Sequence, residues 1–304
     1  MPEILLGTSG WSYEEWIGPF YNDEKRMFSY YARFFKTVEI NSTFYRYPSK
    51  STIYGLNRAS PRGFIFSAKL PRLITHKKKM SLQENVKSDL MRFLEILEPL
   101  SSSGKLGCIL IQLPPKFTYD KDFERLEAFL EIIPDGYEFA VEFRNPSWIR
   151  SETWKILREH NIAYCAVDEP YFPSDVHVTA DFAYFRWHGR NPRLWYNYRY
   201  SEEELKEWVP KLEEASRKTR KVYGYFNNHF HGYAIENCIE FMQMLKIAER
   251  KHEEVKKRII EYNLYGASEW GGLKIENLSD EKSLIWQLLL KITDLNRIRR
   301  GIRI

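Results

Sequence analysis

Eight short apolar segments, separated by longer segments of mixed polarity, constrain the fold of this 304-residue chain more than any other feature of its sequence. In chain order they are ILLGTSG from residue 4, TVEIN from 37, FIFSAKL from 64, LGCILIQL from 106, EFAVEF from 138, AYCAVD from 163, FAYFRWH from 182 and KVYGYFN from 221. Nearly continuous apolar strands that alternate with helices are typical of parallel sheets covered by helices. Eight repeats of strand and helix therefore predict an α/β fold, a TIM (β/α)8 barrel.

The segments between these strands carry apolar residues at helical spacing. We predict helices at residues 25–36, 82–98, 121–132, 151–160 and 202–219, and another in GYAIENCIEFMQMLKIAER after the eighth strand. The helices expected after the second and sixth strands are short or irregular. Because a TIM barrel typically takes about 250 residues, we assign residues 1–250 to the barrel domain and residues 251–304 to a helical, mildly basic C-terminal extension. The amphipathic run DEKSLIWQLLLKITDLNRI in this extension suits packing on the barrel or a homo-oligomer contact.

The composition is that of a soluble globular protein, with 43% hydrophobic and 29% charged residues. No window reaches the ~18 apolar residues of a membrane span, and the N-terminus lacks the segments of a signal peptide. The three scattered cysteines are expected to be buried thiols. We therefore expect a cytoplasmic protein without a membrane partner. Residues 246–304 hold 13 Lys and Arg against 9 Asp and Glu, a balance that allows a nucleic acid partner without requiring one.

Polar side chains gather at the carboxyl ends of the predicted strands, the end at which TIM barrels carry their active sites. In four strands they form i, i+2 pairs, which share one face of a strand. The pairs are Glu39 with Asn41, Ser67 with Lys69, Glu142 with Arg144, and Arg186 with His188; Gln112, Asp168, Asn227 and Asn228 end other strands. Confined charges need partners or a use. We favour a site at this end of the barrel over the alternative, a self-neutralised ion network that plugs its mouth.

The residue types at this end of the barrel suit two kinds of chemistry. The predicted catalytic residues are Glu39, Lys69, Glu142 and His188. Carboxylates and a histidine from separate strands suit a divalent metal ion, and the predicted ligands of Mg²⁺ or Mn²⁺ are Glu39, Glu142, Asp168 and His188. Arginine suits an anion, because a guanidinium binds phosphate or carboxylate through two parallel hydrogen bonds.

Several loops suit a phosphate-bearing or aromatic ligand. HGRN (188–191) and NNHFHGYA (227–234) follow the last two strands, where this fold usually binds phosphate, although capping explains the histidines of the second loop equally well. The aromatic residues of GTSGWSYEEWIGPFY (7–21) suit stacking on bases or sugars, or a hydrophobic lid. LPRLITHKKKM (70–80) suits a polyanion or plain solvent exposure. The predicted substrate-binding residues are Asn41, His76, Arg144, Arg186, Asn227, Asn228, Trp11 and Tyr13.

Ordered blocks of the sequence resemble a known family. They are GTSGWSYEEWIGPFY, VEINSTFYRYPS, ITHKKKM, LGCILIQLPPKF, FAVEFRNPSW, YFRWHGRN and VYGYFNNHFHGYAIENC, within roughly residues 4–245. They are similar to the conserved blocks of the domain-of-unknown-function 72 family, also called the YecE-like proteins. The resemblance implies a TIM barrel and brings no settled activity. The shared motif positions are Glu39, Asn41, Lys69, His76, Gln112, Glu142, Arg144, His188, Asn227 and Asn228.

Three functions remain open at this point. The first is a hydrolase acting on a phosphate-bearing substrate such as a DNA or RNA phosphodiester, with or without a divalent metal, in which His188 or His76 is the general acid. The second is an isomerase or lyase acting on a sugar or sugar phosphate, in which Lys69 or a carboxylate moves a proton. The third is a non-catalytic nucleic-acid-binding protein that binds through its extension.

Overall fold

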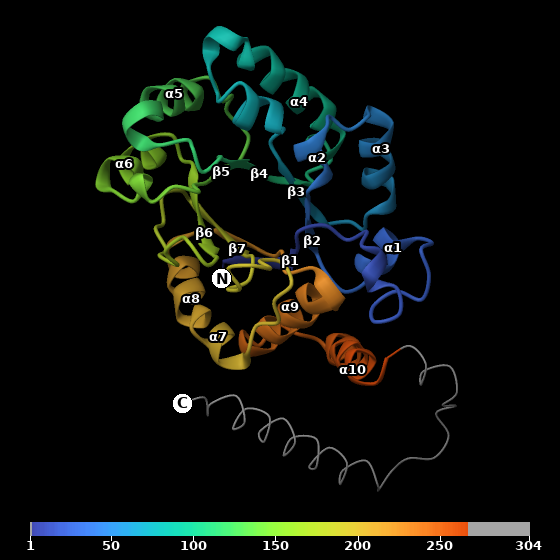
Figure 1. Ribbon diagram of the computed structural model, residues 1–304. Coiled ribbons are helices and arrows are strands. Elements are labelled where there is room, and N and C mark those ends of the chain that lie inside the picture. The colour runs from blue at the N-terminus through green and yellow to red at the C-terminus, as the bar shows by residue number, and fades with distance from the viewer. Residues whose placement is uncertain (1, 267–304) are drawn as a thin grey trace, which may run out of the picture. The chain divides into compact units, whose positions relative to one another are not determined.

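The computed structural model describes residues 2–266, and its strands form one eight-stranded parallel sheet (Figure 1). The strands are β1 (Glu3–Thr8), β2 (Thr37–Ile40), β3 (Ile65–Lys69), β4 (Leu106–Gln112), β5 (Phe139–Glu142), β6 (Ala163–Asp168), β7 (Phe182–Trp187) and β8 (Lys221–Phe226). They pair in the order β1-β8-β7-β6-β5-β4-β3-β2, and every ladder is parallel. All eight predicted strands are confirmed, and so is the TIM-barrel fold class.

The barrel closes between β1 and β2 through a bridge instead of a full ladder. Gly10 N–H donates to the Glu39 carbonyl oxygen at 2.8 Å, next to the single bridge between Ser9 and Glu39. Below this bridge the Tyr31 hydroxyl accepts from Thr8 N–H at 2.9 Å and donates to the Thr37 carbonyl oxygen at 3.0 Å. A side chain therefore supplies the hydrogen bonds that a strand pair would otherwise make, and the barrel is nearly closed.

Helices surround the strands (Figure 1). They are α1 (Met27–Tyr31), α2 (Ser42–Tyr45), α3 (Lys50–Ala59), α4 (Val86–Ser101), α5 (Tyr119–Glu131), α6 (Ser151–Glu159), α7 (Glu202–Lys206), α8 (Trp208–Lys218), α9 (Tyr233–Met244) and α10 (Arg250–Tyr265). Single helical turns occur at η1 (Glu14–Trp16), η2 (Leu73–Lys77), η3 (Leu82–Glu84), η4 (Pro146–Trp148) and η5 (Phe230–Gly232).

The predicted helices are found with different lengths. The predicted helix 202–219 is divided into α7 and α8 at Glu207, where Pro210 has no N–H to donate to the carbonyl of Lys206. The connection after β2 holds two helices, because the Ser49 side chain caps a new helix by accepting from Thr52 N–H at 3.1 Å. In the connection from β6 to β7 the described chain has no helix.

Alternate strand residues face the helices and the barrel interior. On the helix side, the Phe185 and Trp187 rings of β7 pack on Trp208 of α8, with centroids 6.1 and 5.6 Å apart. On the interior side, the rings of Tyr184 and Tyr225 lie 5.4 Å apart. Tyrosine side chains thus pack inside the barrel, and their hydroxyl groups lie beneath the carboxyl ends of the strands.

Helix α10 contacts the barrel, although the sequence assigns it to the extension. His252 Nε2 donates to the Phe34 carbonyl oxygen at 2.6 Å, and Arg258 Nη2 donates to the Gly18 carbonyl oxygen at 2.7 Å. One compact unit spans Met1–Leu264. The amphipathic run of the extension and its predicted homo-oligomer contact lie outside the described residues. Within the described residues, no helix combines the length and the apolar character that crossing a bilayer requires.

Candidate active site at the carboxyl ends of the strands

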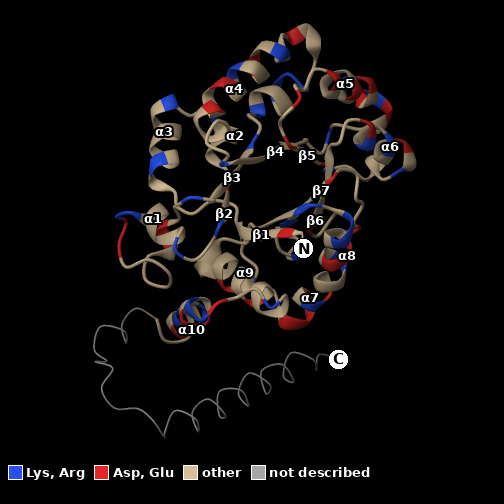
Figure 2. Cartoon of the chain, turned by 180° about the vertical axis from the view of Figure 1, so that it is seen from behind, with Lys and Arg blue, Asp and Glu red and all other residues tan. Residues whose placement is uncertain are grey.

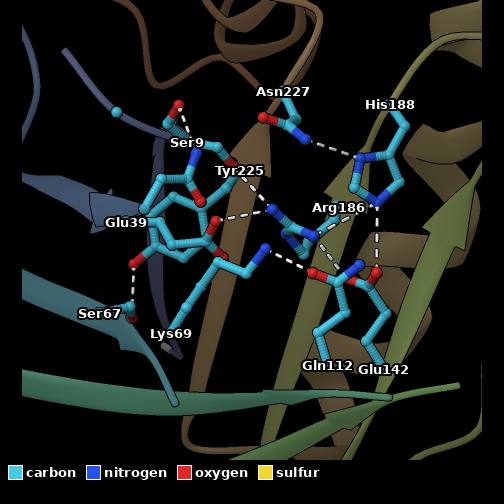
Figure 3. A network of polar contacts seen from close by, with 12 residues as sticks. Ser9, Glu39, Ser67, Lys69, Gln112, Glu142, Arg186, His188, Tyr225 and Asn227 are labelled. Carbon is cyan, nitrogen blue, oxygen red and sulfur yellow. Dashed lines mark hydrogen bonds and ion pairs between the residues drawn. The ribbon is translucent and has the colours of Figure 1, made fainter. Parts of the chain in front are cut away.

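A buried ion cluster lies at the base of the site, centred on Arg186 of β7 (Figure 3). Its Nη1 donates to Glu142 Oε2 at 2.5 Å, and its Nη2 donates to Glu39 Oε1 at 2.7 Å. The Tyr184 hydroxyl donates to Glu39 Oε2 at 2.7 Å. The side chains of Arg186, Glu39 and Glu142 are at most 1% exposed. One arginine thus joins the carboxylates of β2 and β5 across the barrel.

Glu142 and Arg186 keep their charges in this cluster. Burial alone would raise the pKa of Glu142, but the guanidinium groups of Arg144 and Arg186 hold it well below its ordinary value. Burial alone would lower the pKa of Arg186, but Glu142 and Glu39 hold it well above its ordinary value. Glu39, Glu142 and Arg186 therefore form the ion network that the sequence leaves as an alternative, and this network is buried. A reaction at this end of the barrel must use the residues that line the space above the network.

Arg144, at the end of β5, extends the cluster upward. Its Nε donates to Glu142 Oε1 at 2.6 Å, and its Nη1 donates to a carboxylate oxygen of Glu169. Its Nη2 lies 3.1 Å from His188 Nε2. Because a guanidinium only donates, His188 Nε2 is the accepting nitrogen in this contact, and the other ring nitrogen, Nδ1, lies 3.0 Å from the side-chain amide nitrogen of Asn227.

His188 is a neutral ring in this position. Burial, together with the cations Arg144 and Arg186, lowers the pKa of His188 to about 3. Burial and the nearby Lys69 likewise lower the pKa of His76 to about 4. Neither histidine is in the imidazolium form, the form that acts as a general acid, near neutral pH, so the general-acid role that the sequence suggests for them does not fit their surroundings.

Lys69, at the end of β3, is the unusual cation of the site. Its Nζ donates to Gln112 Oε1 at 2.5 Å and lies 4.5 Å from the centroid of the Phe44 ring. Among the described residues no carboxylate forms an ion pair with it, although it is only 9% exposed. Burial, followed by the neighbouring Arg186, lowers the pKa of Lys69 to about 7. A large fraction of these amines is therefore uncharged at neutral pH.

Two cavities open above the ion cluster. The larger, of about 400 Å³, is lined by Gly10, Trp11, Ser12, Tyr13, Asn41, Ser42, Tyr45, Lys69, Tyr196, Asn227 and His229. The smaller, of about 350 Å³, is lined by His76, Gln112, Leu113, Pro115, Arg144, Glu169, Tyr171 and Trp195. The hydrogen bond between Lys69 and Gln112 connects a residue of one cavity to a residue of the other.

Most predicted site residues are brought together. Lys69, Asn41, Trp11, Tyr13 and Asn227 line the larger cavity, and His76 and Arg144 line the smaller one. Glu39, Glu142, Arg186 and His188 lie beneath them, at most 1% exposed.

Asn228 does not fit the predicted binding role. It is fully buried, and its Nδ2 donates to the Tyr198 carbonyl oxygen at 2.8 Å and to Asn237 Oδ1 at 2.9 Å. These bonds fasten the loop after β7 to α9, which is a structural role.

Asp168 is not brought to the site, so the predicted ligand set for Mg²⁺ or Mn²⁺ is dispersed. It pairs in register with Trp187, whose side chain faces the helices. Its carboxylate accepts from Trp208 Nε1 at 2.5 Å and from Arg190 Nη2 at 2.9 Å. Residues 2–266 contain no group of three His, Cys, Asp or Glu side chains placed to hold a metal ion.

Glu169 is the site residue that the sequence analysis missed. It lies one position beyond Asp168 on the opposite face of the chain, accepts from Arg144 and lines the smaller cavity. Burial, opposed by Arg144, raises the pKa of Glu169 to about 7. The strand register explains its position: Val167 pairs in register with the inward-facing Arg186, and position i+2 from Val167 is Glu169.

A sequence profile described as "Protein of unknown function DUF72" matches residues 5–259. The chain belongs to this family. A DUF72 family protein of Thermotoga maritima MSB8 has 37% sequence identity and a TM-score of 0.72, over 80% of this chain and 99% of that chain. The UPF0759 protein YunF of Bacillus subtilis (strain 168) is 25% identical over 80% of this chain and 95% of its own length. The UPF0759 protein YecE of Escherichia coli (strain K12) is 26% identical over 48% of this chain and 50% of its own length.

The DUF72 assignment confirms the family expected from the ordered sequence blocks. The matched region covers most of β1, all of β2 to β8 and most of α10, so the cavities and the ion cluster lie within the family fold.

Proposed function

We propose that this protein is an enzyme that moves a proton on a small carbonyl compound, a sugar or sugar phosphate, as an isomerase or lyase. The observation that carries the proposal is Lys69, which lines a cavity of about 400 Å³ and whose amine has a pKa lowered to about 7. Catalytic acids and bases are most effective when their pKa lies near the working pH. The cavity volume falls within the ~300–1,000 Å³ of typical small-molecule sites.

The lining of the larger cavity suits a hydroxylated substrate. The amides of Asn41 and Asn227 offer donors and acceptors, and the Trp11 and Tyr13 side chains offer aromatic surface for the apolar face of a sugar. Tyr13 is held in place, because its hydroxyl donates to the Ser9 carbonyl oxygen at 2.5 Å and its ring stacks on His229 with centroids 4.4 Å apart. This wall is therefore largely formed before a substrate binds.

The charge of the chain segment between Glu39 and Glu84, part of which lies at the mouth, supports a phosphate group on the substrate. Between Glu39 and Glu84 the chain has no acidic residue and nine basic ones, which are Arg46, Lys50, Arg58, Arg62, Lys69, Arg72, Lys77, Lys78 and Lys79. Helix α3, within this segment, carries blue and no red in Figure 2. Arg46, Arg72, Lys77 and Lys79 are exposed in the connections that follow β2 and β3, and no ion pair joins them to the described residues.

A metal-assisted phosphodiester hydrolase finds less support at this site. Asp168 is engaged outside the barrel, and Arg186 occupies the carboxylates of both Glu39 and Glu142. The two histidines proposed as acids have lowered pKa values, of about 3 for His188 and about 4 for His76. We therefore propose proton transfer instead of hydrolysis as the reaction, on a substrate that bears a phosphate group.

The test is hydrogen exchange at the carbon next to the carbonyl group. The purified chain is incubated in D₂O with a panel of aldoses, ketoses and their phosphates, and deuterium incorporation is followed by NMR. We expect incorporation into at least one phosphate ester, with a rate that rises through about pH 7 as Lys69 loses its proton. Lys69→Met should lower this rate by about 100-fold or more.

Lys218→Met is the matched control, because Lys218 is an exposed lysine at the C-terminal end of α8 and should leave the exchange rate unchanged. The proposal fails if no compound of the panel exchanges, or if Lys69→Met exchanges as fast as the wild-type protein.

A second candidate function, non-catalytic binding of single-stranded nucleic acid, is favoured by exposed aromatic residues at the mouth. Tyr45 of the larger cavity is 68% exposed, and Tyr171 of the smaller cavity is 64% exposed. Aromatic faces beside unpaired cations are the usual combination for single strands.

Fluorescence anisotropy with labelled DNA and RNA oligonucleotides tests this candidate. If Arg46, Arg72, Lys77 and Lys79 each contact one phosphate, the affinity should fall about 50-fold between 50 and 200 mM salt. Tyr45→Ala should weaken binding by about 1–3 kcal/mol. Binding that is absent at low salt, or that is unchanged in Tyr45→Ala, contradicts it.

A further inference from the structure

We propose that Lys69 binds its substrate covalently, by forming an imine with an aldehyde or ketone group in the larger cavity. This inference rests on the proposed function and specifies how the carbonyl compound is held. Lys69 differs from most buried lysines in its partners. Buried lysines are normally paired with carboxylates, whereas the partners of Lys69 among the described residues are an amide oxygen and an aromatic ring.

The surroundings keep the amine uncharged and ready to react. Arg144 and Arg186 remain protonated beneath it, and both disfavour a further positive charge at Lys69. An uncharged amine has a free electron pair, which the ammonium form lacks. Lys69 is thus the strongest nucleophile that reaches either cavity, because the three cysteine thiols are buried and line neither of them.

The contacts of Nζ also fix its direction. Gln112 Oε1 accepts one N–H at 2.5 Å, and the Phe44 ring lies 4.5 Å away. An amide oxygen cannot take the proton from the amine at neutral pH, so this hydrogen bond orients the nitrogen without protonating or deprotonating it. Lys69 lines the larger cavity together with Asn41 and Asn227, and we place the approach of the carbonyl group on that side.

The chemistry of the step is balanced without any further reagent. The nitrogen electron pair forms a bond to the carbonyl carbon, and the carbonyl oxygen takes up the proton that the nitrogen loses, which gives a carbinolamine. Loss of that oxygen as water, with the second N–H proton, gives the imine. When protonated, the imine carries the same positive charge as the ammonium form; burial, Arg186 and Arg144 oppose that charge at this position, and the carboxylates of Glu39 and Glu142 offset part of their effect. The protonated imine withdraws electrons from the neighbouring C–H bond more strongly than the free carbonyl group does.

Reductive trapping tests the inference. The full chain is incubated at pH 7 with glycolaldehyde, D-glyceraldehyde 3-phosphate, dihydroxyacetone phosphate or pyruvate, together with sodium cyanoborohydride, and the adducts are mapped by mass spectrometry of peptides. About half of the Lys69 amines are unprotonated at pH 7, against about one in 2,500 for an ordinary lysine. We therefore expect Lys69 to be labelled about 100-fold or more faster than exposed Lys218, and this preference should disappear at pH 10.

Gln112→Glu provides a second variant that leaves the lysine in place. A carboxylate at this position favours the ammonium form, so labelling of Lys69 should fall by about 10-fold or more at pH 7 and recover at pH 10. Circular dichroism verifies that the variant is folded.

The imine and the proposed function fail in different ways. Labelling of Lys69 no faster than that of Lys218, or labelling that Gln112→Glu leaves unchanged at pH 7, overturns the imine. If deuterium exchange still depends on Lys69 in that case, the proposed function stands with Lys69 as a non-covalent base. Rapid labelling of Lys69 without any deuterium exchange supports the imine and overturns the proton-transfer function.

Discussion

Replacement of Arg186 by methionine is expected to lower the free energy of unfolding by about 3–5 kcal/mol, as observed when one partner of a buried ion pair is removed. Arg186 lies between Glu39 and Glu142, which are both fully buried. Without its guanidinium group, Glu39 keeps a hydrogen bond from Tyr184 and Glu142 keeps one from Arg144, so neither carboxylate loses all of its partners. The net charge of the cluster nevertheless becomes more negative by one unit in a buried position. Urea denaturation measures the effect.

The pH dependence of this variant distinguishes lost charge compensation from lost packing. With Arg186 absent, the pKa of Glu142 should rise, because Arg186 is one of the two cations that hold it down. A proton taken up at low pH then relieves part of the penalty, so the loss should be smaller at pH 5 than at pH 8. Arg46→Met, at an exposed arginine without an ion pair to the described residues, should change stability by no more than about 0.5 kcal/mol. A loss below about 1 kcal/mol for Arg186→Met would show that the cluster does not stabilise the barrel.

The second large effect concerns Lys69 and is independent of any substrate. The pKa of Lys69 is about 7 in the folded protein, against about 10.4 in an unfolded chain. At a pH between these two pKa values, Lys69 is protonated in the unfolded chain and unprotonated in the folded protein. Unfolding therefore takes up a proton, and a lower pH favours unfolding. The free energy of unfolding should therefore rise with pH between about 7 and 10, by up to about 1.4 kcal/mol per pH unit from this residue alone.

Lys69→Met removes this contribution. The free energy of unfolding of the wild-type protein relative to Lys69→Met should increase from pH 7 to pH 10, whereas Lys218→Met should follow the wild-type curve. Guanidinium chloride denaturation at four or five pH values is sufficient. Parallel curves for the wild-type protein and Lys69→Met would mean that the lysine keeps an ordinary pKa in the folded state.

The sequence was sufficient to predict the barrel because its strands carry a simple pattern. Runs such as LGCILIQL remain apolar on both faces, as a strand buried between helices and barrel interior must. The closure between β1 and β2 was not predictable in this way. It depends on the Tyr31 hydroxyl reaching two backbone groups that are distant in sequence, and no local periodicity encodes that contact.

For the candidate site, the sequence predicted which side of a strand each side chain lies on, but it did not predict how deeply the side chain is buried. The i, i+2 rule correctly placed Glu142 with Arg144 and Arg186 with His188 on the inner face. It did not indicate that Glu39, Glu142 and Arg186 form a buried network while Lys69 reaches a cavity, because depth depends on the stagger of neighbouring strands. Asp168 was assigned to the wrong face by one residue, and such a shift moves a side chain from the interior of a barrel to its outside.

The most direct measurement is the titration of Lys69 itself. Heteronuclear NMR of the full chain labelled with ¹³C and ¹⁵N in lysine follows each side chain from pH 5 to pH 11, and Lys69→Arg identifies the signal. We expect one lysine with a titration midpoint near pH 7, well below the ordinary lysine value of about 10.4, and absent from the spectrum of the variant. A Lys69 signal that titrates together with the exposed lysines would contradict both the proposed catalytic amine and the covalent site derived from it.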